Sequence, residues 1–491
     1  MLVGTPSAGG QGLESRYGVA GTTVWRFDET RRRSVDYDYM ITTTMKPNHT
    51  VARDHCLAPA RASRVALAGA RYGRLFPEPP PLDLRPDQLR ALGRLGGLCD
   101  ASDGFDYARE VAAGWPIFGQ YIAHDLTADR SALTMRADVD ALVNFHSPRA
   151  NLECLYGDGP SAQPFMYSHA DGAKLLLNGH DLPRNSEGVA LSPDPRQDVH
   201  VPMSQLQVGL ARMHNRLVDR LRQDGVPEGE LFEEARRAAT WHYQSVILNG
   251  LLPTAIGPER AARLLSEGPR LFLSAGETPY IPLEFADGAY RYGHSQVRGE
   301  FHLNHGGSPL RLSPDLVGFQ PLPPEKAIDW RLFFDVPGEP PAQRAKKIDG
   351  RLCASLMALP AAIVGSVRDS ELASLALRDL KRGVGTGLPS GEAVARALGE
   401  EPLTPAQTGL DGVSSWEGET PLWYYVLKEA ELHSDGERLG PVGGTIVGEV
   451  LVGVIDRDPE SYSAVDPGWR PTLPSREAGR FTIEDALVPN E

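Results

Sequence analysis

Two polar side chains suited to proton transfer lie four residues apart in the segment WPIFGQYIAHDLT, residues 115–127. On a helix this spacing places Gln120 and His124 on one face, while Asp125 points elsewhere. An imidazole in such a position can act as a general acid or base. By itself, however, the His-Asp pair is more typical of a hydrogen-bonded pair in a core or at a surface.

Two further segments carry side chains that could bind or catalyse. In DPRQDVHVPMSQLQVGLARMHNRL, residues 194–217, Arg196 stands just ahead of an amphipathic stretch. In AYRYGHS, residues 289–295, His294 follows Gly293, and a glycine there lets a bulky flat group approach the backbone. Taken singly, an arginine is more typical of a solvated charge, and a merely buried histidine would look no different.

Helices are expected to position these segments. Apolar residues recur every three to four positions over residues 204–222, a second helical pattern covers 230–251, and a third over 446–455 is nearly apolar on one whole side. Alternating strand patterns, repeats and long linkers are scarce or absent. We therefore predict a mainly α fold, a single large helical domain with few short strands and long loops over residues 63–491. A partly irregular N-terminal extension, residues 1–62, would precede it.

The composition is that of a soluble globular protein with an acidic surplus. Asp and Glu outnumber Lys and Arg by 64 to 50, giving a formal charge of −14. This balance argues against nucleic acid or an anionic membrane as the main partner. No apolar run approaches the ~18 residues of a membrane span. The first residues do not resemble a secretory signal, which favours a cytoplasmic location, and the four cysteines lack CxxC spacing and are expected to be ordinary thiols.

Together, the three segments resemble the motifs of the animal-type haem peroxidase superfamily, the group that includes myeloperoxidase and the cyclooxygenases. The sequence GQYIAHDLT at 119–127, the spacing from Arg196 to the following His-Asn pair, and RYGH at 291–294 match in the right order. The likeness runs over residues 71–475, most of the chain. It is closest to the peroxidase branch and to its bacterial members.

On the distal side, the resemblance implies catalytic roles for three residues. His124 would be the distal base, Gln120 a hydrogen-bonding partner in the distal pocket, and Arg196 the distal arginine. The implied activity is that of a peroxidase, which reduces hydrogen peroxide through a ferryl intermediate and oxidises small phenolic or (pseudo)halide donors. His124 would move a proton between the two peroxide oxygens, and Arg196 would support the negative charge that develops as their bond stretches.

On the proximal side, the resemblance makes His294 the ligand of the haem iron. The family's proximal Asn falls at Asp379, where a carboxylate can accept the same hydrogen bond with a full charge. An anionic Asp379 would make His294 more imidazolate-like and lower the reduction potential of the iron. Arg291 and Arg382 align with residues that pair with the haem propionates, a role that planar guanidinium groups suit.

The resemblance also implies a calcium site beside the distal helix. Its ligands would be the side chains of Asp125, Ser147, Asn151 and Glu153 and the carbonyl oxygen of Arg149. All of them offer the hard oxygen that Ca²⁺ prefers. Asn151 stands where the family often has Asp, so binding would be weaker, and the alternative is a hydrogen-bonded loop without a metal.

The sequence departs from the mammalian enzymes where their haem is covalently linked. Ala123 and Val199 replace the two carboxylates that form esters, and His200 replaces the Met that forms a sulfonium link. We therefore expect non-covalent haem b, although Asp198, one residue away, leaves a shifted ester open. Chloride becomes a less favoured donor than iodide, bromide, thiocyanate or phenols.

Two alternative functions remain open at this point. A fatty-acid oxygenase of the same superfamily would carry a radical-forming Tyr three residues before the proximal His, but Arg291 occupies that position. Tyr290 and Tyr292 flank it and are expected to point to other faces. A degenerate, non-catalytic haem-binding module is the second alternative, and the presence of the distal His, the distal Arg and the proximal His argues against it.

Overall fold

Helices dominate the computed structural model, as the sequence predicted. It describes residues 71–128, 142–272, 280–365, 370–414 and 416–488, so the predicted extension over residues 1–62 lies outside the described residues. The helices are α1 (Pro86–Gly93), α2 (Gly114–Leu126), α3 (Glu153–Tyr156), α4 (Val201–Gln223), α5 (Leu231–Val246), α6 (Leu252–Ile256), α7 (Pro258–Glu267), α8 (Ala354–Met357), α9 (Ala361–Val364), α10 (Leu375–Gly385), α11 (Gly391–Leu398), α12 (Pro405–Thr408), α13 (Leu422–Ser434), α14 (Pro441–Asp456), α15 (Tyr462–Val465) and α16 (Ile483–Leu487).

The described strands are short and form three separate two-stranded sheets. A parallel pair joins β1 (Tyr72–Gly73) to β3 (Ile281–Pro282), and antiparallel pairs join β2 (Tyr107–Ala112) to β6 (Arg344–Lys346) and β4 (Glu300–Phe301) to β5 (Leu310–Arg311). These strands tie distant loops together and do not form a layer of their own. None of the described helices is long and apolar enough to cross a bilayer.

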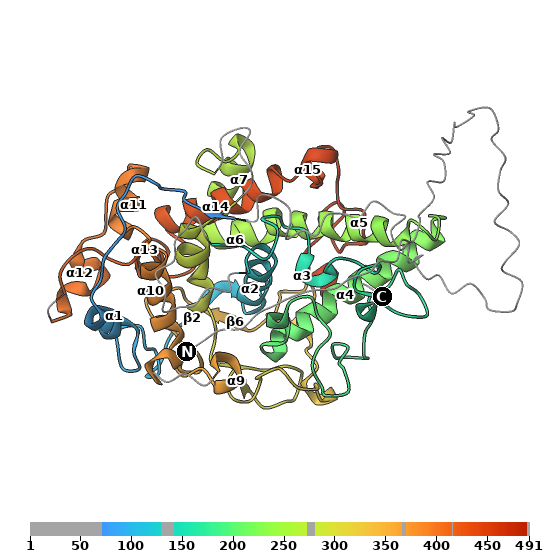
Figure 1. Ribbon diagram of the computed structural model, residues 1–491, viewed down its shortest axis with the longest axis horizontal. Coiled ribbons are helices and arrows are strands. Elements are labelled where there is room, and N and C mark those ends of the chain that lie inside the picture. The colour runs from blue at the N-terminus through green and yellow to red at the C-terminus, as the bar shows by residue number, and fades with distance from the viewer. Residues whose placement is uncertain (1–70, 129–141, 273–279, 366–369, 415, 489–491) are drawn as a thin grey trace, which may run out of the picture. The chain divides into compact units, whose positions relative to one another are not determined.

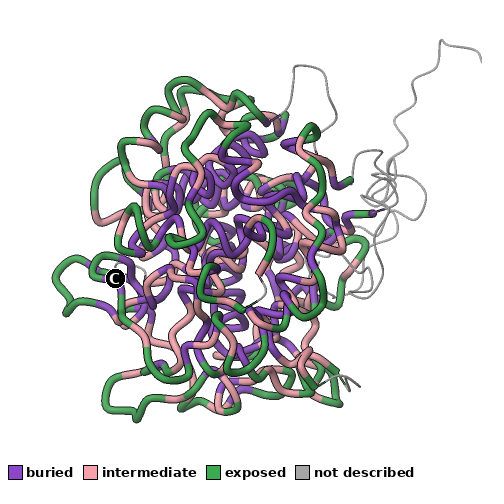
Figure 2. Tube along the Cα trace, turned by 90° about the vertical axis from the view of Figure 1, so that its left-hand side faces the viewer, coloured by how far each residue is buried: buried purple, intermediate pink, exposed green. Residues whose placement is uncertain are grey.

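The most apolar helix, α14, is enclosed by other elements and not merely apolar on one side. Every residue from Ile446 to Ile455 is buried, and the helix packs against α6, α7, α11 and α13. Gly453 permits a close approach there, because a Cβ at this position would lie 2.1 Å from a ring carbon of Phe272. A helix that is hydrophobic all round is typical of a buried core element. Figure 2 shows this buried interior as the purple segments of the tube.

Helices α4 and α5 lie side by side (Figure 1) and confirm two of the predicted helical patterns. His200 precedes α4 as its N-cap, and α5 continues through a π-helical turn, Ile247–Leu251, into α6. Helix α2 packs against α4 and against the 3-10 segment Ala289–His294, called η7. The fold thus brings the first and third chemical segments into contact.

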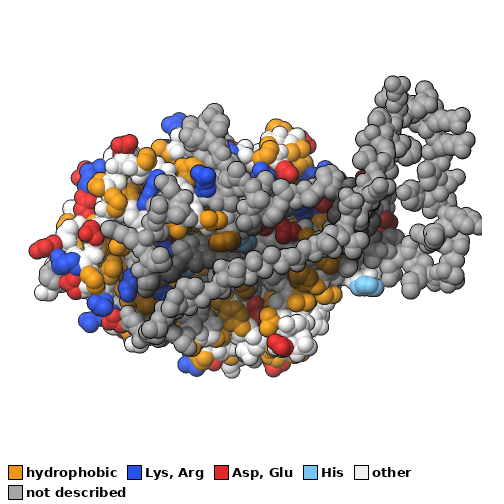
Figure 3. All heavy atoms as spheres, viewed as in Figure 1, with side chains coloured by type: hydrophobic (Ala, Val, Ile, Leu, Met, Phe, Trp, Pro, Cys, Tyr) orange, Lys and Arg blue, Asp and Glu red, His pale blue; other side chains and the backbone are white. Residues whose placement is uncertain are grey.

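Charged side chains of both signs are interspersed on the face drawn in Figure 3. Among the described residues in that view, the basic side chains do not gather into one stripe. A clustered basic face is the electrostatic signature of a nucleic-acid binder.

Candidate active site

The predicted distal and proximal segments meet at one cavity. About 860 Å³ of empty space lies beside α2 and η7, and both His124 and His294 line it. A second, apolar cavity of about 930 Å³ shares Gln120 and His294 with the first. The two histidines therefore face one shared space.

Helix α2 presents its two catalytic candidates on one side, as predicted. Gln120 and His124 both line the cavity, whereas Asp125 is buried on another side, where it accepts hydrogen bonds from the backbone N–H groups of Leu152 (2.9 Å) and Cys154 (3.3 Å). Tyr121 and Ile122, which stand between Gln120 and His124, are buried in the core. Packing on that apolar side fixes the rotation of the helix and hence the direction of His124.

The orientation of the His124 ring is set by Gln197, a residue that the sequence did not single out. His124 Nδ1 lies 3.4 Å from Gln197 Oε1, and because an amide oxygen only accepts, Nδ1 carries the proton. Nε2 then keeps its lone pair. Burial, with a smaller contribution from Arg196, lowers the pKa of His124 to about 3. The ring is therefore a neutral base at ordinary pH, as a proton acceptor must be.

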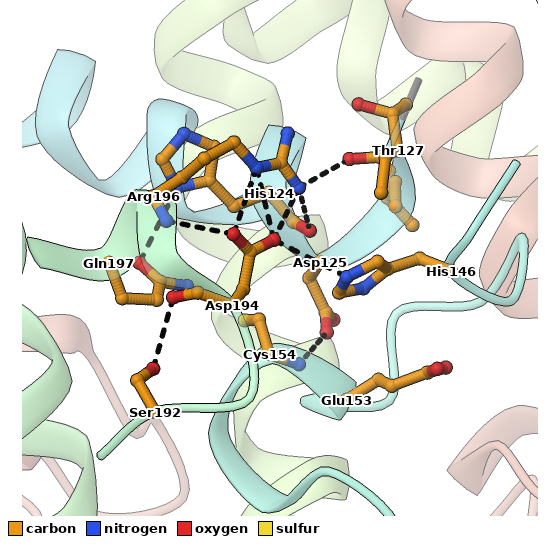
Figure 4. Close-up of polar contacts among 12 residues, drawn as sticks. His124, Asp125, Thr127, His146, Glu153, Cys154, Ser192, Asp194, Arg196 and Gln197 are labelled. Atoms are coloured by element: carbon orange, nitrogen blue, oxygen red, sulfur yellow. Dashed lines mark hydrogen bonds and ion pairs between the residues drawn. The ribbon is translucent and has the colours of Figure 1, made fainter. Parts of the chain in front are cut away.

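Arg196 lines the same cavity but is held by Asp194 (Figure 4). Its Nε lies 3.0 Å from both carboxylate oxygens, and its Nη2 donates to the carbonyl oxygens of His124 (3.1 Å) and Thr127 (2.7 Å). Asp194 also lies 3.3 Å from His146 Nε2. Burial works to raise the pKa of Asp194, but the bonds from His146 and Arg196 outweigh it and lower the pKa. The arginine thus braces the end of α2 while its charge is balanced.

The proximal candidate, His294, is anchored through one nitrogen. Its Nδ1 donates to Asp379 on α10 at 2.6 Å, and Asp379 is fully buried. Burial works to raise the pKa of Asp379, but His294 and Arg291 outweigh it and lower the pKa. The carboxylate is therefore an anionic acceptor. Because Nδ1 donates this hydrogen bond, Nε2 is the nitrogen that would coordinate a metal.

Arg291 lines the cavity and bonds to acidic residues of the proximal side, while its propionate contact stays a prediction. It donates from Nη1 to Asp379, from Nη2 to Asp287 and from Nε to the Ala286 carbonyl, each at 2.9 Å. An Asp at position 379 attracts this cation more strongly than a neutral Asn would. Arg291 thus clamps the acceptor of His294. Arg382 lies in the last turn of α10 and is not among the described residues that line either cavity, so its propionate role stays a prediction.

The predicted calcium ligands form a hydrogen-bonded loop. Ser147 Oγ donates to Glu153 Oε2 (2.6 Å), and Asn151 Nδ2 donates to Ser147 Oγ (3.0 Å). In Figure 4 the Glu153 carboxylate points away from Asp125. The Arg149 side chain pairs with Asp458, which leaves its carbonyl oxygen, the predicted ligand, untested. Among the described residues, no three His, Cys, Asp or Glu side chains are grouped as a metal site. The calcium site stays a prediction.

The residues flanking the cavity bear on covalent links to a cofactor. Ala123 and Val199 each line one of the two cavities, and neither can form an ester. Asp198, the candidate for a shifted ester, is buried and accepts two hydrogen bonds from Arg184, at 2.6 and 2.8 Å. Its carboxylate is therefore committed to another partner.

One expectation about the proximal segment is wrong. Tyr290 and Tyr292 were expected to point to other faces, but both line the cavity that contains His294. The short 3-10 segment runs along the cavity wall, so that successive residues contribute to it. The hydroxyl group of Tyr290 is buried without a hydrogen-bond partner among the described residues.

Comparison with known proteins agrees with this geometry. Residues 166–316, which include Arg196 and His294, match the sequence model of the animal haem peroxidase family. That segment of the chain is therefore similar to animal haem peroxidases. In addition, 174 residues are 35% identical to chorion peroxidase of Drosophila melanogaster, and 180 residues are 30% identical to heme peroxidase 2 of Caenorhabditis elegans. These matches cover 31% and 32% of this chain but only 22% and 25% of the two relatives, so the chain matches about a quarter of their length or less.

Two solved structures share the fold over most of this chain. Peroxidase A from Dictyostelium discoideum superposes with a TM-score of 0.61 at 16% identity, covering 81% of this chain and 89% of that one. A fatty acid alpha-dioxygenase from Arabidopsis thaliana superposes with a TM-score of 0.55 at 14% identity, covering 82% and 75%. At such identities the likeness concerns the fold alone.

Proposed function

We propose that this chain is a haem-dependent peroxidase that reduces hydrogen peroxide and oxidises small phenolic or (pseudo)halide donors. One observation carries the proposal: His124 and His294 line the same cavity from two different elements, and each has its Nδ1 engaged by another residue. One ring can therefore offer Nε2 as a base, and the other can offer Nε2 to a metal. This is the division of labour that a peroxidase requires.

The residues present fit a haem. Both apolar and polar side chains line the cavity, and His294 is backed by a carboxylate that fixes its tautomer, as metal-ligating histidines usually are. His294 would hold the iron. When bound, the haem would supply the metal to which peroxide binds and the redox equivalents that the donor restores.

The chain's own part in the reaction is proton transfer and charge stabilisation. His124 would accept a proton at Nε2 from the nearer peroxide oxygen and return it to the departing one. A positioned base of this kind contributes roughly 10²–10⁴-fold to the rate. Arg196, fixed against Asp194, would face the charge that develops on the departing oxygen without having to move.

The haem is proposed to be non-covalent haem b. Support comes from Ala123 and Val199 at the ester positions and from Asp198, whose carboxylate is bonded to Arg184. Extraction with acidified acetone should remove the pigment into the organic phase. Haem that stays on the protein would contradict this part of the proposal.

A calcium ion is proposed at the loop after α2, with Asp125, Ser147, Asn151 and Glu153 and the Arg149 carbonyl as ligands. Support comes from the oxygen atoms of Ser147 and Glu153, which already lie together. Ca²⁺ that binds only the folded chain would stabilise it. Removing it with a chelator should therefore lower the melting temperature, and adding Ca²⁺ should restore it. An unchanged melting temperature with no calcium in the purified protein would contradict the site.

A fatty-acid oxygenase is the second candidate, favoured by the apolar cavity that adjoins the first. Ile117, Phe301 and Leu356 are among its lining residues, and such a wall suits an acyl chain. Against it, Arg291 stands where the radical-forming Tyr would be. Oxygen uptake with a fatty acid as the only substrate would favour this candidate over a peroxidase.

Donor oxidation by the hemin-loaded protein tests the proposed function. The wild-type chain should oxidise guaiacol or iodide only when peroxide is added. The His124→Ala variant should keep its Soret band but react with peroxide roughly 10²–10⁴-fold more slowly. His302→Ala, which removes an exposed histidine, is the matched control and should behave as wild type. A Soret band without peroxide-dependent oxidation would point to the non-catalytic alternative.

A further inference from the structure

His200, at the N-cap of α4, connects the apolar cavity to Gln120 on α2. It is buried, and its side chain and Gln120 both line that cavity. Both ring nitrogens are engaged. The backbone N–H of Met203 donates to Nδ1 at 3.3 Å, and Nε2 lies 2.9 Å from Gln120 Oε1.

These two contacts fix the tautomer of His200. A backbone N–H group can only donate, so Nδ1 must be the unprotonated nitrogen. A neutral imidazole with an acceptor at Nδ1 carries its proton on Nε2. Burial lowers the pKa of His200 to about 4, which keeps the ring neutral at ordinary pH. Nε2 therefore donates, and its partner must be the oxygen of the Gln120 amide.

The tautomer of His200 in turn fixes the amide of Gln120. A glutamine amide has one acceptor oxygen and an NH₂ group with two donors. His200 holds the oxygen on the side of the apolar cavity, and no described residue accepts from the Gln120 NH₂ group. Gln120 also lines the cavity between His124 and His294. The NH₂ group is thus the end of the amide left to face that space.

We propose that His200 is a positioning residue, which turns the Gln120 amide so that its N–H donors, and not its oxygen, face the cavity between His124 and His294. Without His200 the amide could turn over and present its oxygen. A donor there stabilises a small anion, whereas an oxygen repels it. This inference rests on the proposed function, because the anion would bind beside the haem iron.

Two substitutions separate the two bonds that His200 makes. His200→Asn keeps an oxygen for the Met203 N–H, since Asn is a good N-cap, but the shorter side chain cannot reach Gln120. His200→Gln keeps an NH₂ group that can reach Gln120 and is a poorer cap. His200→Asn should therefore weaken anion binding and keep stability, whereas His200→Gln should keep anion binding and lower stability. A general loss of structure would lower both in either variant.

The probe is fluoride, which binds ferric haem and is followed by the absorption spectrum of the hemin-loaded protein. His200→Asn should bind fluoride on the order of tenfold more weakly, the effect of one hydrogen bond to a charged group. Its melting temperature should stay near that of wild type. His200→Gln should bind fluoride nearly as well as wild type but melt earlier. Equal fluoride affinity in wild type and His200→Asn would overturn the proposal.

A double-substitution cycle checks that His200 acts through Gln120. In a Gln120→Leu background, His200→Asn should cause no further loss of fluoride affinity, because the amide it would orient is gone. The same loss in both backgrounds would show that His200 acts by another route, and would overturn the inference.

A measurement without haem separates this inference from the proposed function. In protein labelled with ¹⁵N-histidine, the two ring nitrogens of His200 should show the shifts of a protonated Nε2 and an unprotonated Nδ1 near neutral pH. The reverse tautomer, or a charged ring, would overturn the positioning role even if haem binds. Failure to bind hemin with the expected tautomer present would instead count against the proposed function.

Discussion

At the scale of single residues, the site depends on which nitrogen of each histidine carries a proton. Nδ1 of His124 donates a hydrogen bond to a neutral amide, that of Gln197. Nδ1 of His294 donates a hydrogen bond to a carboxylate, that of Asp379. A neutral partner adds no negative charge beside the distal ring. An anionic partner increases the electron density that the proximal ring can pass to a metal. The two acceptors thus suit the two rings to different tasks.

Replacing Asp379 by Asn tests whether the negative charge on the acceptor of His294 matters. Asp379→Asn keeps an oxygen for His294 Nδ1 but removes the negative charge, so the reduction potential of the bound haem should rise. A potentiometric titration of the hemin-loaded protein measures it. Asp287→Asn is the matched control, because Asp287 contacts Arg291 but not His294, and its shift should be smaller. A potential that stays the same or falls in Asp379→Asn would contradict the role.

The sequence predicted the residues with motif signatures better than their partners. Gln120 and His124 share one side of α2, because their spacing of four residues fixes it, and His294 lines the same cavity. Gln197 could not be predicted as the partner of His124, since 73 positions separate them and the contact depends on how two elements pack. The clamp of Arg291 on Asp379 escaped prediction for the same reason, with 88 positions between them.

At the scale of elements, periodicity predicted the long helices and failed for the short irregular ones. The patterns over 204–222 and 230–251 correspond to α4 and α5, whose apolar stripes face the core. The 3-10 segment that carries His294 is only Ala289–His294, too short for a periodic signal. Its conformation follows from packing against α2, α13 and α14. This is why the directions of Tyr290 and Tyr292 were predicted wrongly.

The attachment of the C-terminal segment to α5 predicts a loss of stability in acid. His242 on α5 accepts hydrogen bonds from the backbone N–H groups of Thr472 and Leu473 at Nε2, both at 3.0 Å. Burial lowers its pKa to about 4, below the ordinary ~6.5 of an unfolded chain. The unfolded state therefore binds more protons as the pH falls, and stability present at neutral pH is lost between about 6.5 and 4.

Urea unfolding at pH 7.5 and at pH 5 measures this loss in wild type and in His242→Gln. Gln cannot titrate, so the variant should lose less free energy of unfolding between the two pH values, by on the order of 2 kcal/mol. His302→Ala, at an exposed position, is the control and should keep the wild-type pH dependence. Equal losses in His242→Gln and wild type would show that His242 does not titrate on unfolding.

At the scale of the whole described chain, the fold gathers residues from distant segments around two adjoining cavities. Gln120 and His294 line both of them, although 174 positions separate these residues in the sequence. The mainly α class followed from helical periodicity and scarce strand patterns. The cavities could not be predicted, because they depend on where long loops run between helices. The roles of the site residues were predicted from the resemblance to a haem-binding family, because helical periodicity says nothing about them.

Hemin titration of the purified chain tests the central claim, that His294 holds a haem iron in this cavity. Wild type, His124→Ala and the control His302→Ala should each bind one hemin and develop the same Soret band. His294→Ala should bind hemin far more weakly and without the spectrum of a histidine-ligated iron. Undiminished binding in His294→Ala, with loss in His124→Ala instead, would mean that the two faces are exchanged. Binding unaffected by either substitution would contradict the account altogether.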